Sequence, residues 1–245
     1  MIFVPSQLHH RHCQTETEAD FPARFSLLCW NVHKKNLTHP GFQPFVASLM
    51  RRYPLSLVLL QEAQIREEGC IFSGFFCDAA ANMEIKKQFY GVLTASIQRA
   101  REAEAYLTEA SEGFVGPHKS LLLTTYALPE ERSLLLLNLH AINFREQRMY
   151  EEELERVIAK AAEHEGPMII AGDFNTWSRK RTDALHLLRE RLALQTAVFD
   201  AGKVKSFMGY PLDFILYRGM QCVETEIVTD HGISDHHPLL ATFCL

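Results

Sequence analysis

The chain has 245 residues, 47% of them apolar, which is enough to bury a sizeable core and suits one large domain better than two small ones. Acidic residues number 30 against 25 basic ones, for a formal net charge of -5, whereas a protein that coats nucleic acid non-specifically would be basic. No apolar run reaches the roughly 18 residues that a membrane-spanning helix needs, so no membrane span is predicted.

Residues 1–24 are predicted to form a loosely ordered N-terminal extension, and residues 25–245 a single domain. The start of the chain lacks the basic-then-apolar order of a secretory signal. Six cysteines are scattered without the spacing of a metal site. We interpret them as free thiols of a cytoplasmic protein, with a bridge between Cys70 and Cys77 as the alternative.

The first predicted elements alternate between strands and a helix. Residues 25–32 form an apolar strand that carries Asn31 near its end. Apolar residues at helical spacing predict an amphipathic helix over 42–52, which the following proline stops. A second strand over 55–61 ends at Glu62, so each of the two strands has a polar side chain at its end.

The middle of the chain is predicted to consist of strands and loops. Residues 78–88 show no periodic pattern and are interpreted as a loop. The pattern over 98–107 suits a strand or a helix equally well. Alternating or continuous apolar residues predict further strands over 89–96, 119–127 and 133–139, with the last two joined as a hairpin.

Two helices flank the most strongly predicted strand. The helix over 144–164 places apolar residues on one face, and glutamates 151, 152, 153 and 155 are expected on its solvated side. A strand follows over 168–175, then a helix over 182–191, then strands over 211–218, 220–229 and 238–244. Many strands with few helices indicate two packed mixed sheets with helices outside, an α/β architecture.

Polar residues recur where apolar runs end. In Gly172-Asp173-Phe174-Asn175, strand alternation puts the carboxylate and the carboxamide on the same side of the chain. Asp213 lies inside an apolar run, where a carboxylate is costly unless it is paired. An isolated His140 or His236 would be an ordinary histidine at a strand end, but six separate segments offering polar groups indicate one shared site.

The order of these segments resembles the endonuclease/exonuclease/phosphatase (deoxyribonuclease I-like) superfamily from about residue 25 to the end. The matching pieces are Trp30-Asn31, Gln61-Glu62, Asn138-Leu139-His140, Gly172-Asp173-Phe174-Asn175, Leu212-Asp213-Phe214 and Ser234-Asp235-His236-His237-Pro238. Further pieces are similar to the bacterial YafD-type members: Leu60-Gln61-Glu62-Ala63-Gln64, His140-Ala141-Ile142-Asn143-Phe144, Asp173-Phe174-Asn175-Thr176-Trp177-Ser178-Arg179 and Tyr217-Arg218-Gly219. The resemblance implies a four-layer α/β/β/α sandwich, one or two Mg²⁺ ions, for which Mn²⁺ would substitute, and phosphoester hydrolysis.

Phosphoester hydrolysis by in-line attack needs an activated water, and the resemblance supplies a candidate for each role. His236 is the expected general base, because its unperturbed pKa lies near neutral pH. The resemblance implies that Asp213 holds the other ring nitrogen. Asp173 would orient the water and Asn175 would grip a phosphate oxygen. His140 would protonate the leaving group or hydrogen-bond the phosphate.

The expected metal ligand is Glu62, with Asn31 and Asp235 completing or buttressing the site. Cations after the central motif are expected to contact a polyanion, with Trp177 stacking beside them. The alternative is a solvated helix start with Trp177 packed under it. The full set of expected substrate contacts is Asn143, Lys119, Trp177, Arg179, Lys180 and Arg181.

The favoured hypothesis is therefore a Mg²⁺-dependent phosphodiesterase acting on DNA or RNA. A phosphatase or phosphodiesterase of a small molecule or lipid headgroup would use the same residues, and the net negative charge favours it, whereas the patch from Trp177 to Arg181 favours the nuclease. A catalytically silent binding module is the third hypothesis. No protein partner is evident from the sequence.

Overall fold

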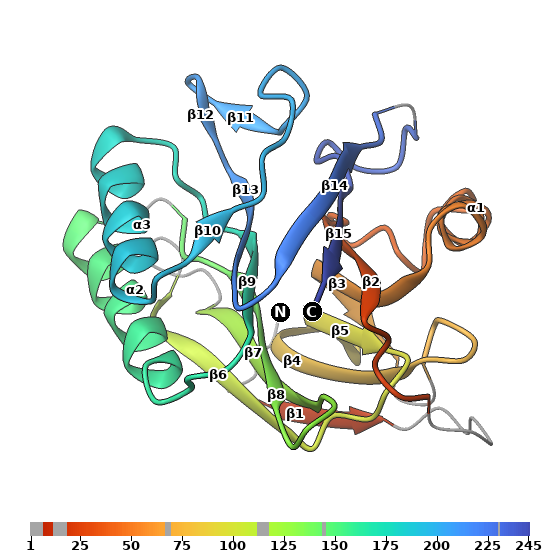
Figure 1. Ribbon diagram of the computed structural model, residues 1–245. Coiled ribbons are helices and arrows are strands. Elements are labelled where there is room, and N and C mark those ends of the chain that lie inside the picture. Colours follow the sequence, from red (N-terminus) through yellow and green to blue (C-terminus); the bar gives the residue numbers. More distant parts are fainter. Residues whose placement is uncertain (1–6, 12–18, 67–69, 112–117, 144–145, 230) are drawn as a thin grey trace.

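The computed structural model in Figure 1 describes residues 7–11, 19–66, 70–111, 118–143, 146–229 and 231–245. Two mixed β-sheets pack face to face in its middle. Helix α1 (Phe42–Arg52) covers the outer face of one sheet, and α2 (Gln147–Ala161) and α3 (Arg179–Arg191) cover the outer face of the other. The expected α/β/β/α sandwich is confirmed.

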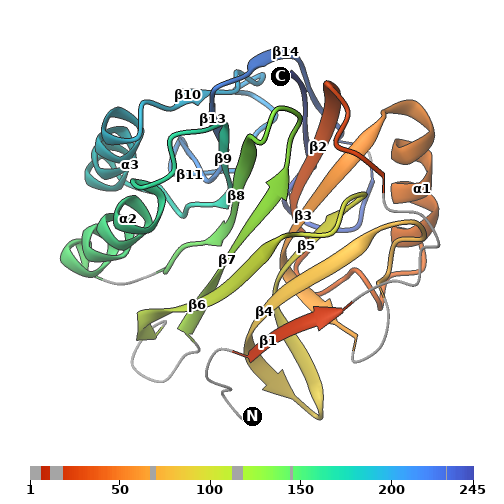
Figure 2. The same ribbon diagram turned by 60° about the horizontal axis from the view of Figure 1, so that its bottom comes forward.

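The first sheet has the strand order β1-β4-β5-β3-β2-β15-β14, and only β2 and β3 are parallel neighbours. Its strands are β1 (Gln7–Arg11), β2 (Arg24–Asn31), β3 (Leu55–Ile65), β4 (Phe76–Ile85), β5 (Gln88–Ser96), β14 (Gln221–Ile227) and β15 (Leu239–Cys244). Figure 2 shows β1 at the edge of this sheet beside β4. The N-terminal extension expected over 1–24 therefore includes a strand, and its residues 1–6 and 12–18 lie outside the described part of the chain.

The second sheet has the order β10-β13-β9-β8-β7-β6, and only β8 and β9 are parallel neighbours. Its strands are β6 (Glu102–Ser111), β7 (His118–Ala127), β8 (Ser133–His140), β9 (Met168–Asp173), β10 (Gln195–Thr196) and β13 (Asp213–Arg218). A separate hairpin of β11 (Ser206–Phe207) and β12 (Tyr210–Pro211) precedes β13 and stands above the sheet in Figure 1.

The strand pairing brings the polar residues at the strand ends to one edge of the sandwich. In the parallel pairs, Asn31 lies opposite Gln61 and His140 lies opposite Asp173. Strand β13 then runs antiparallel to β9 and places Asp213 directly opposite Asp173. Because the carboxyl ends of parallel neighbours meet at the same edge, residues distant in sequence become neighbours there.

The core between the two sheets explains the continuous apolar runs of the sequence. Strands buried on both faces need apolar residues at every position rather than at alternate ones. The inner faces contribute fully buried side chains from both sheets, among them Leu27, Leu57, Leu136, Ile169 and Ile215. The outer faces of the same strands pack against the helices.

Gly172 is required by the close approach of β8 and β9. Its φ of 148° lies outside the range that other residues favour. A Cβ atom built at this position would lie 1.8 Å from the carbonyl oxygen of Leu139. Any side chain here would therefore force apart the two strands that carry His140 and Asp173.

Two sequence-based assignments change in the structure, and one that was left open is resolved. Residues 78–88 form most of β4 and its turn rather than a loop, because an alanine-rich strand of poor propensity is buried between its neighbours. The ambiguous stretch 98–107 contributes to strand β6. Helix α3 begins at Arg179 rather than at residue 182, since the Ser178 hydroxyl accepts a hydrogen bond from the Arg181 amide at 3.4 Å.

Cys70 and Cys77 form a disulfide, with their Cα atoms 5.4 Å apart, so the expectation of free thiols is wrong for this pair. Cys29, Cys222 and Cys244 are free thiols. Disulfides persist mainly in oxidising compartments, and a cytoplasmic location stays a prediction. Within the described residues, no helix combines the length and the apolar character that crossing a membrane requires.

Candidate active site

Asp173 lies at the centre of the polar edge, and its side chain is almost completely buried. Asn31 donates its side-chain N–H to Asp173 Oδ2 at 3.0 Å, and the Asn175 amide donates to Oδ1 at 3.0 Å. His140 Nε2 lies 3.7 Å from Oδ2 and His236 Nε2 lies 3.9 Å from it. Three chain segments distant in sequence therefore converge on one carboxylate.

Asp213 and His236 form a buried hydrogen-bonded pair. The Nδ1 atom of His236 lies 2.8 Å from Asp213 Oδ2, which leaves Nε2 facing Asp173. Burial alone would lower the pKa of His236, but the adjacent Asp213 carboxylate outweighs it and raises the pKa to about 9. The Trp30 indole N–H holds the loop in place by donating to the His236 carbonyl at 2.9 Å. The expected pairing of Asp213 with the imidazole is thus present in the geometry.

Glu62 and His140 face each other across the two sheets. Glu62 Oε1 lies 3.9 Å from His140 Nε2, and Glu62 Oε2 accepts a 2.8 Å bond from Lys34. Burial would raise the pKa of Glu62, yet His140, Lys119 and Lys34 hold it well below its usual range. Burial and then Lys119 lower the pKa of His140 to about 4, against the opposing effect of Asp173 and Glu62.

Asn175 has a backbone φ of 50°, a left-handed conformation that asparagine tolerates better than most residues. Its side-chain nitrogen donates to the Ala141 carbonyl at 2.9 Å. A carboxamide nitrogen carries two N–H donors. This bond is therefore compatible with the expected contact to a phosphate oxygen.

The donors on this edge fit a hard divalent cation. Among the described residues, Asp173, Asp213 and His236 offer ligand atoms that all lie within 4.8 Å of one another. Asp213 Oδ2 already binds His236, whereas Glu62, Asn31 and Asp173 carry side-chain oxygens of the kind that Mg²⁺ prefers, so these are the residues that would hold it. The Asp235 carboxylate lies at the rim, 2.8 Å from Lys205 and 3.5 Å from His33.

Comparison with known proteins agrees with this geometry. The model of the Endonuclease/Exonuclease/phosphatase family matches residues 28–236. The chain belongs to this family. A UPF0294 protein of Vibrio vulnificus (strain YJ016) is 34% identical over 245 residues, covering 98% of this chain and 84% of that protein, which supports the YafD-type resemblance. Members of the family are typically phosphoester hydrolases and generally use divalent metal ions.

Two solved structures show the same fold at low sequence identity. An endonuclease/exonuclease/phosphatase from Beutenbergia cavernae has a TM-score of 0.70 and 16% identity, and the match covers 91% of this chain and 72% of that one. TDP2 from D. rerio, solved with a single-strand DNA product, has a TM-score of 0.62 and 15% identity, and the match covers 91% of this chain and all of that one. The family assignment and the fold therefore agree.

The residues expected to contact the substrate differ in their exposure. Arg179 and Lys180 are exposed at the start of α3. Lys119 is buried on β7, where its charge acts on both Glu62 and His140. Asn143 accepts a 2.9 Å bond from the half-buried Trp177 indole N–H.

Arg181 departs from the expected role in substrate binding. Its side chain is completely buried, with 0% exposed surface. Its guanidinium donates to backbone carbonyls inside the protein. We therefore do not retain Arg181 as a substrate contact.

Sequence reasoning missed several polar residues around the site. Lys34 binds Glu62, and Lys205 binds Asp235; each lysine is close in sequence to a matched piece but carries no pattern of its own. Gln61 donates to Asn138 Oδ1 at 2.7 Å, which links the two sheets beneath the site. Both of these amide residues belong to the pieces that match the family. The sequence therefore indicated that they lie near the site, but not that they bind each other.

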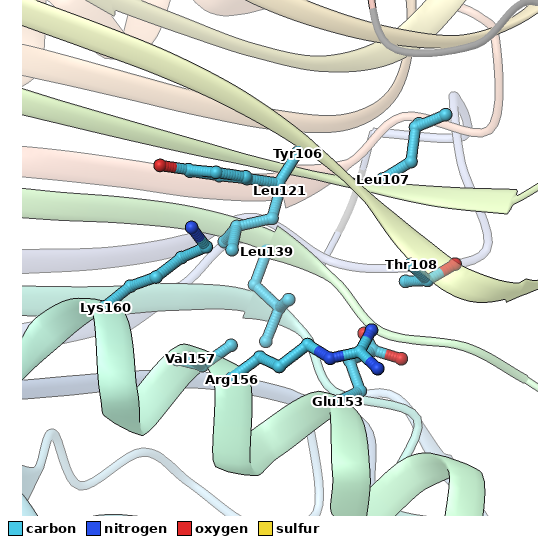
Figure 3. A pocket seen from close by; sticks show the side chains of 9 residues that line it. All are labelled: Tyr106, Leu107, Thr108, Leu121, Leu139, Glu153, Arg156, Val157 and Lys160. Carbon is cyan, nitrogen blue, oxygen red and sulfur yellow. The ribbon is translucent and has the colours of Figure 1, made fainter.

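Behind the site, a cavity of about 220 Å³ lies between β6 and α2 (Figure 3). Glu153 lines it and is buried, so the expectation that this residue is solvated is wrong. One oxygen, Oε2, accepts a 3.3 Å bond from the Ile142 amide, while Oε1 has no hydrogen-bond partner. Burial raises the pKa of Glu153 to about 8, against the lowering effect of the Ile142 amide and Arg181.

Replacing Glu153 with glutamine should change how stability depends on pH. Folding raises the pKa of this buried acid, which favours its protonated form. Its contribution to the free energy of unfolding is therefore complete below the unfolded-state pKa and is lost as pH rises through the folded-state pKa of about 8. Glu153→Gln should flatten this decline, as measured by denaturant unfolding between about pH 5 and about pH 8.5. The exposed Glu152→Gln is the control, and equal slopes for wild type and Glu153→Gln would contradict the assignment.

Proposed function

We propose that the protein is a Mg²⁺-dependent hydrolase that cleaves phosphodiester bonds of nucleic acid. The observation that carries this proposal is the buried Asp213–His236 pair, which directs His236 Nε2 toward Asp173 Oδ2 at 3.9 Å. A water molecule between these two atoms would be within hydrogen-bond reach of both. The site can therefore orient a water with the Asp173 carboxylate and deprotonate it with the neutral form of the His236 ring, which a pKa of about 9 makes more abundant as pH rises above neutral.

Other residues of the site are suited to the remaining steps. Glu62 and Asn31, with Asp173 beside them, would hold the Mg²⁺, whose charge would stabilise the non-bridging oxygens of the phosphate. Asp213 fixes the tautomer of His236 and stabilises the imidazolium that forms when His236 Nε2 takes the proton from water.

His140 is suited to the side of the leaving group. With its pKa lowered to about 4, the ring is neutral at pH 7 and can donate a hydrogen bond from one nitrogen. Lys119 lies close enough to influence both His140 and Glu62 electrostatically. His140 and Lys119 together would stabilise the negative charge that develops on the oxygen of the leaving group.

The surface around the site favours a polyanion with stacking bases. Arg179 and Lys180 are exposed at the start of α3. The β11–β12 hairpin presents Phe207 and Met208, which are 49% and 78% exposed. The hairpin is tied to the site because Lys205, just before it, binds Asp235 beside His236. Cations beside exposed apolar and aromatic side chains are typical of sites that bind single-stranded nucleic acid, and one structural neighbour was solved with a single-strand DNA product.

Supercoiled plasmid incubated with the purified protein and Mg²⁺ should be converted to nicked circles. EDTA should stop the reaction, because removal of the cation leaves the phosphate charge uncompensated. Gel electrophoresis measures both. Nicking that persists in EDTA would contradict the role of the metal.

If the plasmid stays intact, single-stranded DNA, DNA ends and RNA should be tested next as substrates. The net charge of -5 favours, as the second candidate, a phosphatase or phosphodiesterase of a small molecule or lipid headgroup. That candidate predicts turnover of small phosphoesters without plasmid nicking. Absence of both turnover and Mg²⁺ binding in calorimetry would instead indicate a catalytically silent binding module.

A further inference from the structure

Arg181 is a buried cation immediately behind the proposed catalytic residues. Although it follows two exposed cations at the start of α3, its side chain is fully enclosed. The guanidinium carbon lies 4.3 Å from the centre of the Tyr150 ring and 4.6 Å from that of the Trp177 ring. These two aromatic side chains fix the position of the guanidinium by stacking and cation–π attraction.

One nitrogen of this guanidinium joins two segments of the site. Nη1 donates to the Ile142 carbonyl at 2.8 Å and to the Asn175 carbonyl at 3.1 Å. Ile142 lies two residues after His140, and Asn175 lies two residues after Asp173. Arg181 therefore connects the ends of the parallel strands β8 and β9 at the point where the chain leaves the sheet.

Neighbouring side chains hold the same two segments. The Tyr150 hydroxyl donates to the Phe174 carbonyl at 2.9 Å, and Glu153 accepts from the Ile142 amide at 3.3 Å. Figure 3 shows Glu153 on α2 among the residues that line the cavity. Ile142 is thus bonded through its amide to α2 and through its carbonyl to α3.

A buried guanidinium is costly unless its position brings compensating bonds. An apolar side chain could fill the same space without that cost, but it could not link two carbonyls. Asn175 gains most from the link, because its left-handed backbone is a conformation of raised energy. The charged hydrogen bond to its carbonyl helps to keep this conformation.

We propose that Arg181 is a positioning residue, which sets the separation of the His140 segment from the Asp173–Asn175 segment. It touches no substrate and acts through the backbone of Ile142 and Asn175. The inference rests on the proposed phosphoester hydrolysis for its effect on rate, but its structural part concerns the two segments alone. Lysine cannot replace the planar guanidinium, which stacks on two rings while donating.

The test compares Arg181→Met with Arg191→Met. Methionine keeps much of the side-chain length and removes the donors, whereas Arg191 is an exposed residue of the same helix, paired with Glu155. Arg181→Met should lower kcat by about 10²-fold with little change in KM, because displacement of catalytic groups by about 1 Å has effects of this size. Arg191→Met should leave both constants unchanged.

A rescue experiment separates positioning from general damage to the fold. Arg181→Gly should lose activity and regain part of it when methylguanidinium is added at concentrations that do not unfold the protein. Circular dichroism should show both Arg181 variants folded. Wild-type kcat in Arg181→Met would overturn the proposal, as would a loss expressed only in KM.

Hydrogen exchange keeps the test informative if no phosphoester is cleaved. In Arg181→Met, amides of residues 140–143 and 174–177 should exchange faster, while those of α1 should match the wild type. Unchanged exchange in the two segments would refute the positioning role whatever the activity. Absence of turnover in the wild type, with faster exchange in the variant, would refute the proposed function and leave the positioning role intact.

Discussion

His236→Ala should lower the rate of phosphodiester cleavage by about 10²–10⁴-fold, the usual cost of losing a general base. The imidazole is held by Asp213 at 2.8 Å on one nitrogen and faces Asp173 with the other. Alanine removes the group that accepts the proton and leaves the water to react without it. Plasmid nicking at saturating Mg²⁺, measured over time, gives the rate ratio.

The adjacent histidine offers a matched control for this variant. His237 contacts His231 rather than Asp213, with ring nitrogens 3.1 Å apart, and we assign it no catalytic role. His237→Ala should therefore cleave at nearly the wild-type rate. A folded His236→Ala protein that keeps most of its activity would exclude His236 as the base, and equal losses in both variants would indicate damage to the loop instead.

Asp173→Asn should lower the rate of cleavage by at least about 10²-fold while the protein stays folded. The substitution preserves the shape of the side chain but removes the charge that orients the water and faces both histidines. A loss of at least about 10²-fold is expected from the removal of one electrostatic contact to the transition state. Stability should change little, because relief of a charge whose pKa is raised by burial and the nearby Asp213 offsets the loss of one of the two hydrogen bonds that the carboxylate accepts from Asn31 and Asn175.

Calorimetric melting together with the nicking assay tests both parts of this expectation. Asp183→Asn, an exposed change on α3, is the control for loss of one negative charge. An active Asp173→Asn protein would remove Asp173 from the mechanism. A variant that loses activity and unfolds at a much lower temperature would show that the carboxylate serves the fold rather than the chemistry.

The convergence of the proposed catalytic side chains was largely predictable from sequence, because apolar runs mark strands and their polar residues mark strand ends. Asp213 illustrates this: an acid inside an apolar run must be paired, and it is bonded to His236. What the pattern could not supply was the partner of His140, since many glutamates were available. The fold places two carboxylates near His140 Nε2: Asp173 at 3.7 Å, and Glu62 of the other sheet at 3.9 Å, because β3 and β8 lie across from each other where the two sheets pack.

The burial of two charged helix residues, Arg181 and Glu153, could not be predicted from the sequence for a different reason. Arg181 follows two exposed cations at a helix start, and Glu153 sits within a run of glutamates, so composition indicated that both are exposed to solvent. Spacing held a partial signal for Glu153, which lies three residues after the buried Tyr150 and four before the buried Val157. Arg181 had no such signal, because its partners are backbone carbonyls of distant segments.

The division of the site between two sheets has a consequence for protein engineering. Asn31 and Glu62 belong to one sheet, and His140, Asp173 and Asp213 to the other. The size of side chains in the layer between the sheets, such as Leu136 and Ile169, therefore controls the spacing of groups that never touch them. Mutant libraries built to alter substrate preference should vary this inner layer as well as the rim of the site. Adding or removing a single methylene group there would change the distances between the catalytic groups by a small amount.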